Sequence, residues 1–299
     1  MKILLIGKNG QVGFELQRAL APLGDIVAVD YPDCDLTRAD SIRAIVRAAT
    51  PEIIVNAAAF TAVDRAESES EAAFAINAMA PGVLGDEARR LGARVIHYST
   101  DYVYDGAKTA PYLETDATQP LCVYGASKRD GDLALAASGA PHFIFRTSWV
   151  FGAHGANFVK TMLRLAAERD RLNVVADQIG APTAAALIAD VTAQALAQTV
   201  FRRDTELPSG VYHLVADGAT SWHGFAQAVI QGALVRGAEL RMQPQAVRAI
   251  TTAEYPLPAK RPANSRLDTT RLRTTFNLVM PHWQAGLDHV LSQLLGDPK

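Results

Sequence analysis

The first thirty residues constrain the fold most, because an apolar strand, a glycine-rich turn, a helix and a second strand follow one another there. Residues 3–6 form an apolar run that ends at Gly7, and helical periodicity extends over residues 11–20. A second apolar run, residues 26–29, stops at Asp30. Glycines at intervals of three from Gly7 let the backbone approach a pyrophosphate at the N-terminus of that helix. This order predicts a dinucleotide-binding unit, with a tight structural turn as the alternative.

The same alternation continues along the first half of the chain. A helix over residues 39–49 is followed by a short apolar run, 53–55, that ends at Asn56. We expect a helix over 71–91, a strand over 95–99, a helix that carries Tyr124 and a strand over 142–147. Short apolar strands that alternate with helices indicate a parallel sheet covered on both faces. The predicted fold class is therefore α/β, a Rossmann-type doubly wound parallel sheet.

The pattern changes after about residue 150. Helices are expected over 157–169, 187–199, 222–232 and 282–295, and strands over 173–175 and 210–215, with a proline-rich loop stretch between 244 and 262. We predict that residues 1–150 form a dinucleotide-binding domain to which some later segments return. Residues 151–299 then form mainly a smaller C-terminal α/β region that binds the substrate.

Composition limits the partners and the compartment. The chain has 29 Lys and Arg against 31 Asp and Glu, and this net charge of −2 argues against nucleic acid or an anionic membrane as a partner. Its only two cysteines, Cys34 and Cys122, are far apart and have no metal-type spacing. A cleavable signal pattern is lacking, as is an apolar stretch of the ~20 residues that span a membrane. We expect a cytoplasmic protein with free thiols.

Three side chains form a candidate catalytic group. Tyr124 and Lys128 are four residues apart and so share one face of a helix, where an ammonium favours the phenolate and lowers the tyrosine pKa. Tyr124 then serves as a general acid or base near neutral pH. The hydroxyl of Thr100, at the end of an apolar run, can bond the same substrate oxygen. A half-exposed pair on an ordinary helix is the alternative.

The ends of the second and third strands carry candidate cofactor contacts. Asp30 is placed to accept hydrogen bonds from ribose hydroxyls, which favours NADH, whereas Lys8 can offset this carboxylate and admit NADPH. Asp35 and Leu36 are placed near the adenine, with a solvated turn as the alternative. The small residues of Asn56–Ala59 admit the cofactor closely, unless they only pack tightly.

Seven motifs together resemble the extended short-chain dehydrogenase/reductase family. Besides the glycine turn and the Tyr124 helix, they lie at residues 56–64, 99–104, 146–150, 177–183 and 261–265. Sugar-nucleotide dehydratases of this family carry Asp-Glu after the threonine, whereas here Asp101 is followed by Tyr102. The resemblance, which runs nearly end to end, thus implies simple reduction rather than elimination of water.

The resemblance further implies a nucleotide-sugar substrate, dTDP-4-dehydro-L-rhamnose, whose C4 ketone is reduced by NADPH or NADH in the last step of dTDP-rhamnose biosynthesis. Two alternatives stay open: another dTDP-4-keto-6-deoxyhexose, or a non-catalytic nucleotide-binding regulatory subunit. Without the resemblance, Trp149 is equally well a core aromatic and Arg261 a surface ion-pair partner. By position, the implied catalytic residues are Tyr124, Lys128 and Thr100; the cofactor residues are Gly7, Gly10, Gln11, Val12, Asp30, Asp35, Leu36, Ala59, Phe60, Thr61, Tyr124 and Lys128; and the substrate residues are Thr100, Asp101, Tyr124, Trp149 and Arg261.

One position departs from the family pattern. Some members are dimers bridged by magnesium, held by a glutamate matching Glu15 and an acid matching Ala186. Alanine offers no ligand, and Asp190, one turn further on, is a poor substitute because magnesium needs well-placed oxygen ligands. We therefore expect no bound metal, whereas a homodimer through other surfaces stays possible.

Overall fold

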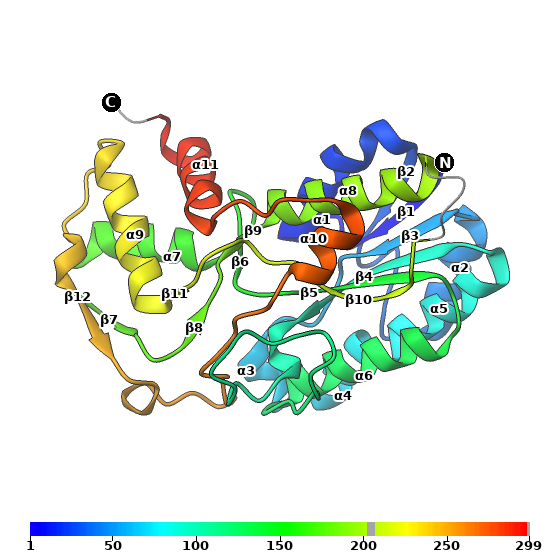
Figure 1. Cartoon of the computed structure of the whole chain (residues 1–299), viewed down its shortest axis with the longest axis horizontal. Coiled ribbons are helices and arrows are strands. Elements are labelled where there is room, and N and C mark those ends of the chain that lie inside the picture. Colours follow the sequence, from blue (N-terminus) through cyan, green and yellow to red (C-terminus); the bar gives the residue numbers. More distant parts are fainter. Residues whose placement is uncertain (202–206, 298–299) are drawn as a thin grey trace.

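A six-stranded parallel sheet forms the centre of the larger part of the molecule in the computed structural model, which describes residues 1–201 and 207–297 (Figure 1). The sequence order of the strands reverses at β1, which lies between β2 and β3, and ligands of such sheets bind where the order reverses, outside the carboxyl ends of the strands. From one edge to the other, the strands are β10 (Gly210–His213), β5 (His142–Thr147), β4 (Arg94–Thr100), β3 (Ile53–Asn56), β1 (Lys2–Ile6) and β2 (Asp25–Val29).

Helices cover both faces of this sheet. On one face lie α1 (Gln11–Leu20) and α8 (Ala185–Phe201), and on the other lie α2 (Ala39–Ala49), α5 (Ala80–Leu91) and α6 (Val123–Ala137) (Figure 1). The alternating side chains of the strands divide between two apolar cores, so that Leu5 packs on the α8 side and Leu4 on the α2 side. The structure thus has the predicted doubly wound α/β architecture.

The helix predicted over residues 71–91 is present, but it contains a π-helical turn that was not predicted. The chain forms α4 (Ser70–Phe74), a π-helical turn (Ala75–Met79) and then α5. Pro81 has no backbone N–H to donate to the carbonyl of Asn77, so the helix widens there. A Cβ at Gly131 of α6 would lie 2.0 Å from that carbonyl oxygen, which explains the glycine in this position.

The last strand of the sheet comes from the second half of the chain. β10 pairs with β5, and α8 packs against α1. The core beneath them also contains Phe276 of a helix that was not predicted, α10 (Thr270–Phe276). Its sequence is rich in threonine, which favours other conformations, so tertiary packing decides its structure.

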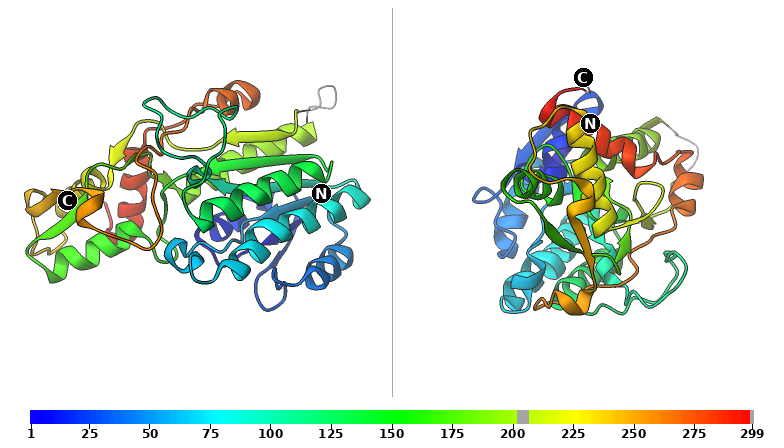
Figure 2. Two further views of the ribbon diagram at one scale, coloured as in Figure 1. Left: turned by 90° about the horizontal axis from the view of Figure 1, so that it is seen from below. Right: turned by 90° about the vertical axis from the view of Figure 1, so that its left-hand side faces the viewer.

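The remaining elements form a smaller part at one end of the molecule, visible in both views of Figure 2. The strand β12 was not predicted, because it lies in the proline-rich stretch and buries only its two end residues. Within the described chain, no helix combines the length and apolar character that a membrane crossing requires. The smaller part consists of α7 (Phe158–Glu168), α9 (Trp222–Val235) and α11 (Trp283–Leu295) with the strand pairs β7 (Leu172–Val175) and β12 (Val247–Ile250), β8 (Ile179–Gly180) and β11 (Thr220–Ser221), and β6 (Val150–Phe151) and β9 (Thr183–Ala184).

Candidate active site

The glycine turn between β1 and α1 has the shape of a pyrophosphate cradle. Gly7 has φ +89°, and a Cβ there would lie 2.6 Å from the amide nitrogen of Ala58. A Cβ at Gly13 would lie 1.9 Å from the carbonyl oxygen of Gly7. Gly10 begins α1 without a capping side chain, so the helix N-terminus is left for an anion. The turn therefore fits the diphosphate of a dinucleotide.

Asp30 lies beside this turn. Its carboxylate accepts hydrogen bonds from the amides of Asn9 and Tyr31, each at 2.9 Å, which ties the end of β2 to the cradle. Asp35 caps its own turn by accepting from Thr37, and this bonding holds the Asp35 pKa below its usual value. Leu36 is buried in the α2-side core. Their expected contacts with ribose and adenine stay predictions.

The loop expected to contact the cofactor, Ala59–Thr61, is held by a residue that sequence reasoning missed. Asn77 accepts from the Phe60 amide at 2.8 Å and donates to the Phe60 carbonyl at 3.0 Å. It also donates to Ser127 of α6 at 3.1 Å. Asn77 sits in the π-helical turn, and Pro81 was the only sequence signal of that turn. The loop and the catalytic helix are thereby joined through one buried amide.

Thr100 and Tyr124 meet at the carboxyl end of the sheet. Thr100 ends β4, and Tyr124 lies in the first turn of α6, where the Thr100 hydroxyl acts on the phenol and favours its ionised form. Thr100 also donates to Asp101 at 3.0 Å and accepts from the Tyr102 amide at 3.2 Å, so its orientation is fixed. The structure thus brings two of the three predicted catalytic groups together.

Lys128 lies one turn further along α6 and is fully buried. Its ammonium nitrogen donates to the Tyr98 carbonyl at 2.6 Å and lies 3.1 Å from Nε2 of His97. Burial lowers the pKa of Lys128 to about 8, although the Asp132 carboxylate opposes this shift. Burial also raises the pKa of Tyr124, against the effect of the Thr100 hydrogen bond. The lowered tyrosine pKa expected from the Lys128 spacing is therefore wrong for this structure, because Lys128 bonds the end of β4.

Asp101 is a buried carboxylate next to the two hydroxyls. Burial raises its pKa to about 6, although hydrogen bonds from Ser265 and Thr100 favour the ionised form. Ser265 belongs to the motif at residues 261–265, so this contact joins the far end of the chain to the catalytic threonine. A carboxyl group with such a pKa is typical of functional sites.

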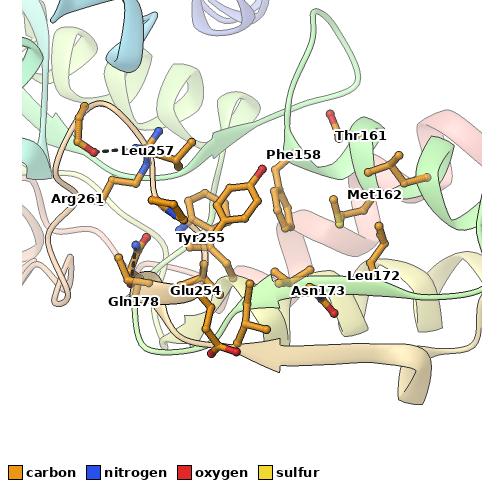
Figure 3. Close-up of a pocket in the computed structure, with 18 of the residues that line it drawn as sticks. Phe158, Thr161, Met162, Leu172, Asn173, Gln178, Glu254, Tyr255, Leu257 and Arg261 are labelled. Carbon is orange, nitrogen blue, oxygen red and sulfur yellow. Dashed lines mark hydrogen bonds between the residues drawn. The ribbon is translucent and has the colours of Figure 1, made fainter.

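A cavity of about 940 Å³ opens in the smaller part, with Arg261 near one end and Met162 and Leu172 near the other (Figure 3). Arg261 forms a bidentate ion pair with Asp64 of the motif at residues 56–64. This pairing was not predicted. The charge of Arg261 also acts on Tyr102, whose ring meets that of Tyr124 edge-on at 5.5 Å between centroids. Arg261 therefore belongs to the cavity lining and also acts on Tyr102, which packs against Tyr124.

Trp149 borders the smaller part. Its ring stacks on that of Trp222 with 3.7 Å between centroids, and Gly180 leaves room for it, since a Cβ there would lie 2.7 Å from the indole. Thr147 pairs with Thr100 in the sheet, so Trp149 leaves the same sheet edge that carries the catalytic residues. Its φ of +49° is uncommon for a bulky residue, and such backbone strain is concentrated at functional sites.

The two acids weighed as metal ligands share a cation from the chain itself. Arg18 contacts Glu15 at 3.4 Å and Asp190 at 2.9 Å. Across residues 1–201 and 207–297, no group of three or more His, Cys, Asp or Glu side chains is arranged to hold a metal ion. Arg18 therefore offsets one of the two negative charges of this pair.

Comparison with known proteins matches this geometry. The chain is 50% identical over 298 residues to the dTDP-4-dehydrorhamnose reductase of Escherichia coli (strain K12), with 98% of each chain covered. It is 48% identical over 296 residues to the Burkholderia thailandensis protein of the same name, with 99% of each covered. The family model of the RmlD substrate binding domain matches residues 1–295. The chain belongs to the RmlD family.

Solved structures extend this result. The chain resembles the Bacillus anthracis dTDP-4-dehydrorhamnose reductase in complex with NADP with a TM-score of 0.88 and 34% identity, covering 98% of this chain and 99% of that chain. A Thermus thermophilus UDP-glucose 4-epimerase in complex with NAD reaches a TM-score of 0.79 at 18% identity, which shows the fold alone. Membership of the RmlD family confirms the resemblance inferred from the motifs.

Proposed function

We propose that the chain is an NAD(P)H-dependent reductase that converts dTDP-4-dehydro-L-rhamnose to dTDP-L-rhamnose. The observation that carries this proposal is the meeting of the Thr100 and Tyr124 hydroxyls at the carboxyl end of the sheet, with Lys128 one turn further along α6. The identity to the E. coli reductase over 98% of both chains supports the same substrate.

The cofactor would be held by the glycine turn. The amides at the start of α1, including Gln11 and Val12, would bind its diphosphate, and Gly10 leaves them accessible. Asp30 and the Phe60 loop flank that position, and Lys128 would bond the nicotinamide ribose. When bound, the reduced nicotinamide supplies the hydride. The relative of known structure in complex with NADP supports NADPH as one such cofactor.

Tyr124 is the proton donor in this proposal. Its raised pKa keeps the phenol protonated at neutral pH, so the proton is available for the ketone oxygen as the C4 carbon is reduced. In this proposal the Thr100 hydroxyl proton turns from Asp101 to the same ketone oxygen, so that both hydroxyls donate to it. The product hydroxyl then leaves with the tyrosine proton, and Tyr124 regains one from solvent. No acidic residue stands at position 102, so these residues have no partner for elimination of water.

We also assign the sugar-nucleotide to the smaller part of the molecule. Residues 1–150 would hold the dinucleotide, and residues 151–299 would contribute most of the substrate site, with Trp149 along the sugar and Arg261 on the diphosphate. The cavity supports this division, because Leu121 is the sole member of its lining that comes from the first 150 residues among those described. Arg261 suits a diphosphate because its planar fork matches two phosphate oxygens.

The test is turnover of the purified protein with dTDP-4-dehydro-L-rhamnose. NADPH and NADH are supplied separately, the loss of reduced nicotinamide is followed by absorbance, and the sugar product is identified by NMR. We expect dTDP-L-rhamnose with at least one cofactor. No turnover with either cofactor overturns the proposal, and faster turnover of another dTDP-4-keto-6-deoxyhexose replaces the substrate. Gel filtration of the purified protein tests whether it forms a homodimer, and cell fractionation tests the expected cytoplasmic location.

A further inference from the structure

A buried chain of hydrogen bonds runs from the cofactor side of the sheet to Lys128. The Ala58 amide lies 3.3 Å from Oδ1 of Asn56, and Nδ2 of Asn56 lies 3.2 Å from Nδ1 of His97. Nε2 of His97 lies 3.1 Å from Nζ of Lys128. Asn56, His97 and Lys128 are each 1% exposed, so solvent is kept from these contacts. The chain crosses three neighbouring elements, β3, β4 and α6.

The Ala58 amide determines which atoms donate and which accept along this series of hydrogen bonds. A backbone amide only donates, so the Ala58 amide makes Oδ1 of Asn56 an acceptor and directs its Nδ2 donor at Nδ1 of His97. A ring nitrogen that accepts carries no proton, and neutral His97 then carries its proton on Nε2. Burial holds the pKa of His97 well below its ordinary value, which keeps the ring neutral. The Nε2 proton points at Lys128, and only the neutral amine has a lone pair to accept it.

We propose that His97 is a positioning residue for Lys128, which it holds at the end of β4 by donating from Nε2 and thereby favouring the neutral amine over the ammonium in the cofactor-free protein. This inference deepens the proposed reductase function and rests on it for the role of Lys128. When the amine gains a proton from solvent, its lone pair is lost. His97 must then move its own proton to Nδ1 while the Asn56 amide turns over, or Lys128 must leave His97.

Asp132 is the charged group that acts directly on Lys128. This carboxylate lies one turn along α6, favours the ammonium, and is itself bound by Ser99 of β4 and Arg146 of β5. Tyr124 lies one turn earlier on the same helix. From the helices packed on the outer side of α6, Glu67 accepts from the Val123 amide and Asn77 bonds Ser127. Asp101 of the short helix η3 (Asp101–Val103) acts on Tyr124.

The direct test is the tautomer of His97. The full-length, cofactor-free protein is labelled with ¹⁵N-histidine, and long-range ¹⁵N–¹H correlation spectra show which ring nitrogen carries the proton. The spectrum of His97→Gln identifies the His97 signals by their loss. At pH ~9.5, where an amine with a pKa of about 8 is neutral, we expect the proton on Nε2. A proton on Nδ1, or on both nitrogens, overturns the inference. Because neither substrate nor turnover is needed, this outcome is independent of the proposed function.

The second test is the pH profile of kcat/KM. Lys128 loses its proton near pH 8, so we expect a fall in activity above that pH in the wild-type protein. Removing a donor to the neutral amine favours the ammonium, so His97→Leu should move this limb upward by ~0.5–1 pH unit. His97→Gln keeps an N–H donor and should restore the wild-type limb.

His142→Leu is the matched control, because His142 is also buried but contacts the carbonyl of Ala140 near the opposite end of the sheet. The alkaline limb of the His142→Leu profile should stay at the wild-type pH. If the alkaline limb of His97→Leu stays in place or moves to lower pH, the inference is overturned. If His97→Leu does not fold, the His97 tautomer and the pH profile of His97→Gln decide. A wild-type protein without turnover overturns the proposed function alone.

Discussion

The Arg261 guanidinium holds both carboxylate oxygens of Asp64, at 2.7 and 3.1 Å, across 197 residues of sequence. Asp64 also accepts from the Ala259 amide, and the ion pair with Arg261 holds its pKa below the usual range. Both partners are partly exposed, so the pair adds little stability. Its effect is positional, because it holds the guanidinium in the lining at one end of the cavity.

Replacing the guanidinium fork should weaken substrate binding. Arg261→Lys keeps the charge but loses bidentate geometry, and Arg261→Ala loses both, so we expect KM for the nucleotide sugar to rise ~10-fold and ~100-fold with kcat changed less than ~3-fold. Initial rates at varied substrate give both constants. Arg248→Lys, on the exposed side of β12, is the control and should behave as wild type. An unchanged KM in Arg261→Ala would remove this residue from the substrate site.

Removing the Tyr124 hydroxyl should stop the reaction without releasing the cofactor. Tyr124→Phe deletes the proposed proton donor, so kcat should fall ~100-fold or more. Fluorescence titration should show NADPH binding within a few fold of wild type. Tyr98→Phe makes the same change at a buried ring whose hydroxyl partner, Thr192, keeps a second bond to Ile188. That variant should stay active, and equal losses in the two would argue for a packing effect.

Asp101 should make the protein less stable as the pH rises. Its folded pKa of about 6 exceeds the unfolded value near 4, so its stabilising proton is bound below pH ~4 and is lost as the pH passes through 6. Asp101→Asn has no such proton. Between pH 4 and pH 7, wild type should therefore lose about 2–3 kcal/mol of unfolding free energy relative to the variant. Urea titrations of both proteins measure this difference. A constant difference across that range would contradict the buried carboxylate.

Two glycines of the cradle should respond differently to alanine. At Gly13 a Cβ would clash with the backbone of Gly7, whereas at Gly10 it would meet that same oxygen at an ordinary 3.5 Å. Gly13→Ala should therefore lower the free energy of unfolding by more than ~2 kcal/mol. Gly10→Ala should fold normally and weaken NADPH binding only. Chemical denaturation and cofactor titration separate the two effects, and equal stability of both variants would contradict the close approach.

Chelators should leave the reductase active. Arg18 contacts both Glu15 and Asp190 and offsets one of their two negative charges, which weakens their attraction for a divalent cation. Turnover after EDTA treatment and gel filtration should equal that of the untreated protein, and added magnesium should change it less than ~2-fold. Loss of activity restored by magnesium would show that this pair binds metal after all. Arg18→Ala removes the cation shared by Glu15 and Asp190. The same assays on this variant show whether the two freed carboxylates bind magnesium.

Local pattern predicted the sheet well because its strands are continuous and apolar. Residues 11–20 and 39–49 form the helices expected, since periodicity and the following Pro22 or Pro51 agree about their ends. The π-helical turn was missed because its cause is a missing N–H at Pro81 combined with the close approach of Gly131 from another helix. No window of sequence contains both.

The site was predicted in part for the same reason. Thr100 and Tyr124 could be placed from strand and helix ends, which the sequence shows directly. The Asp64 partner of Arg261 and the Trp222 partner of Trp149 depend on tertiary distances, and so does the direction in which Lys128 turns. A spacing of four residues says that Lys128 shares a helix face with Tyr124, but the carbonyl of Tyr98 and the ring of His97 decide where its amine lies.

β10 is translated long after the other strands of the sheet, and this order affects how the nascent chain folds. Gly210–His213 pairs with β5, and the core beneath it contains Phe276 and Met280. A nascent chain that has reached residue 150 therefore has β5 as an unprotected edge and an uncovered apolar face. The dinucleotide half cannot complete its folding while the ribosome still holds the last quarter of the chain, and a gene fragment cut at residue 150 should aggregate rather than yield a cofactor-binding module.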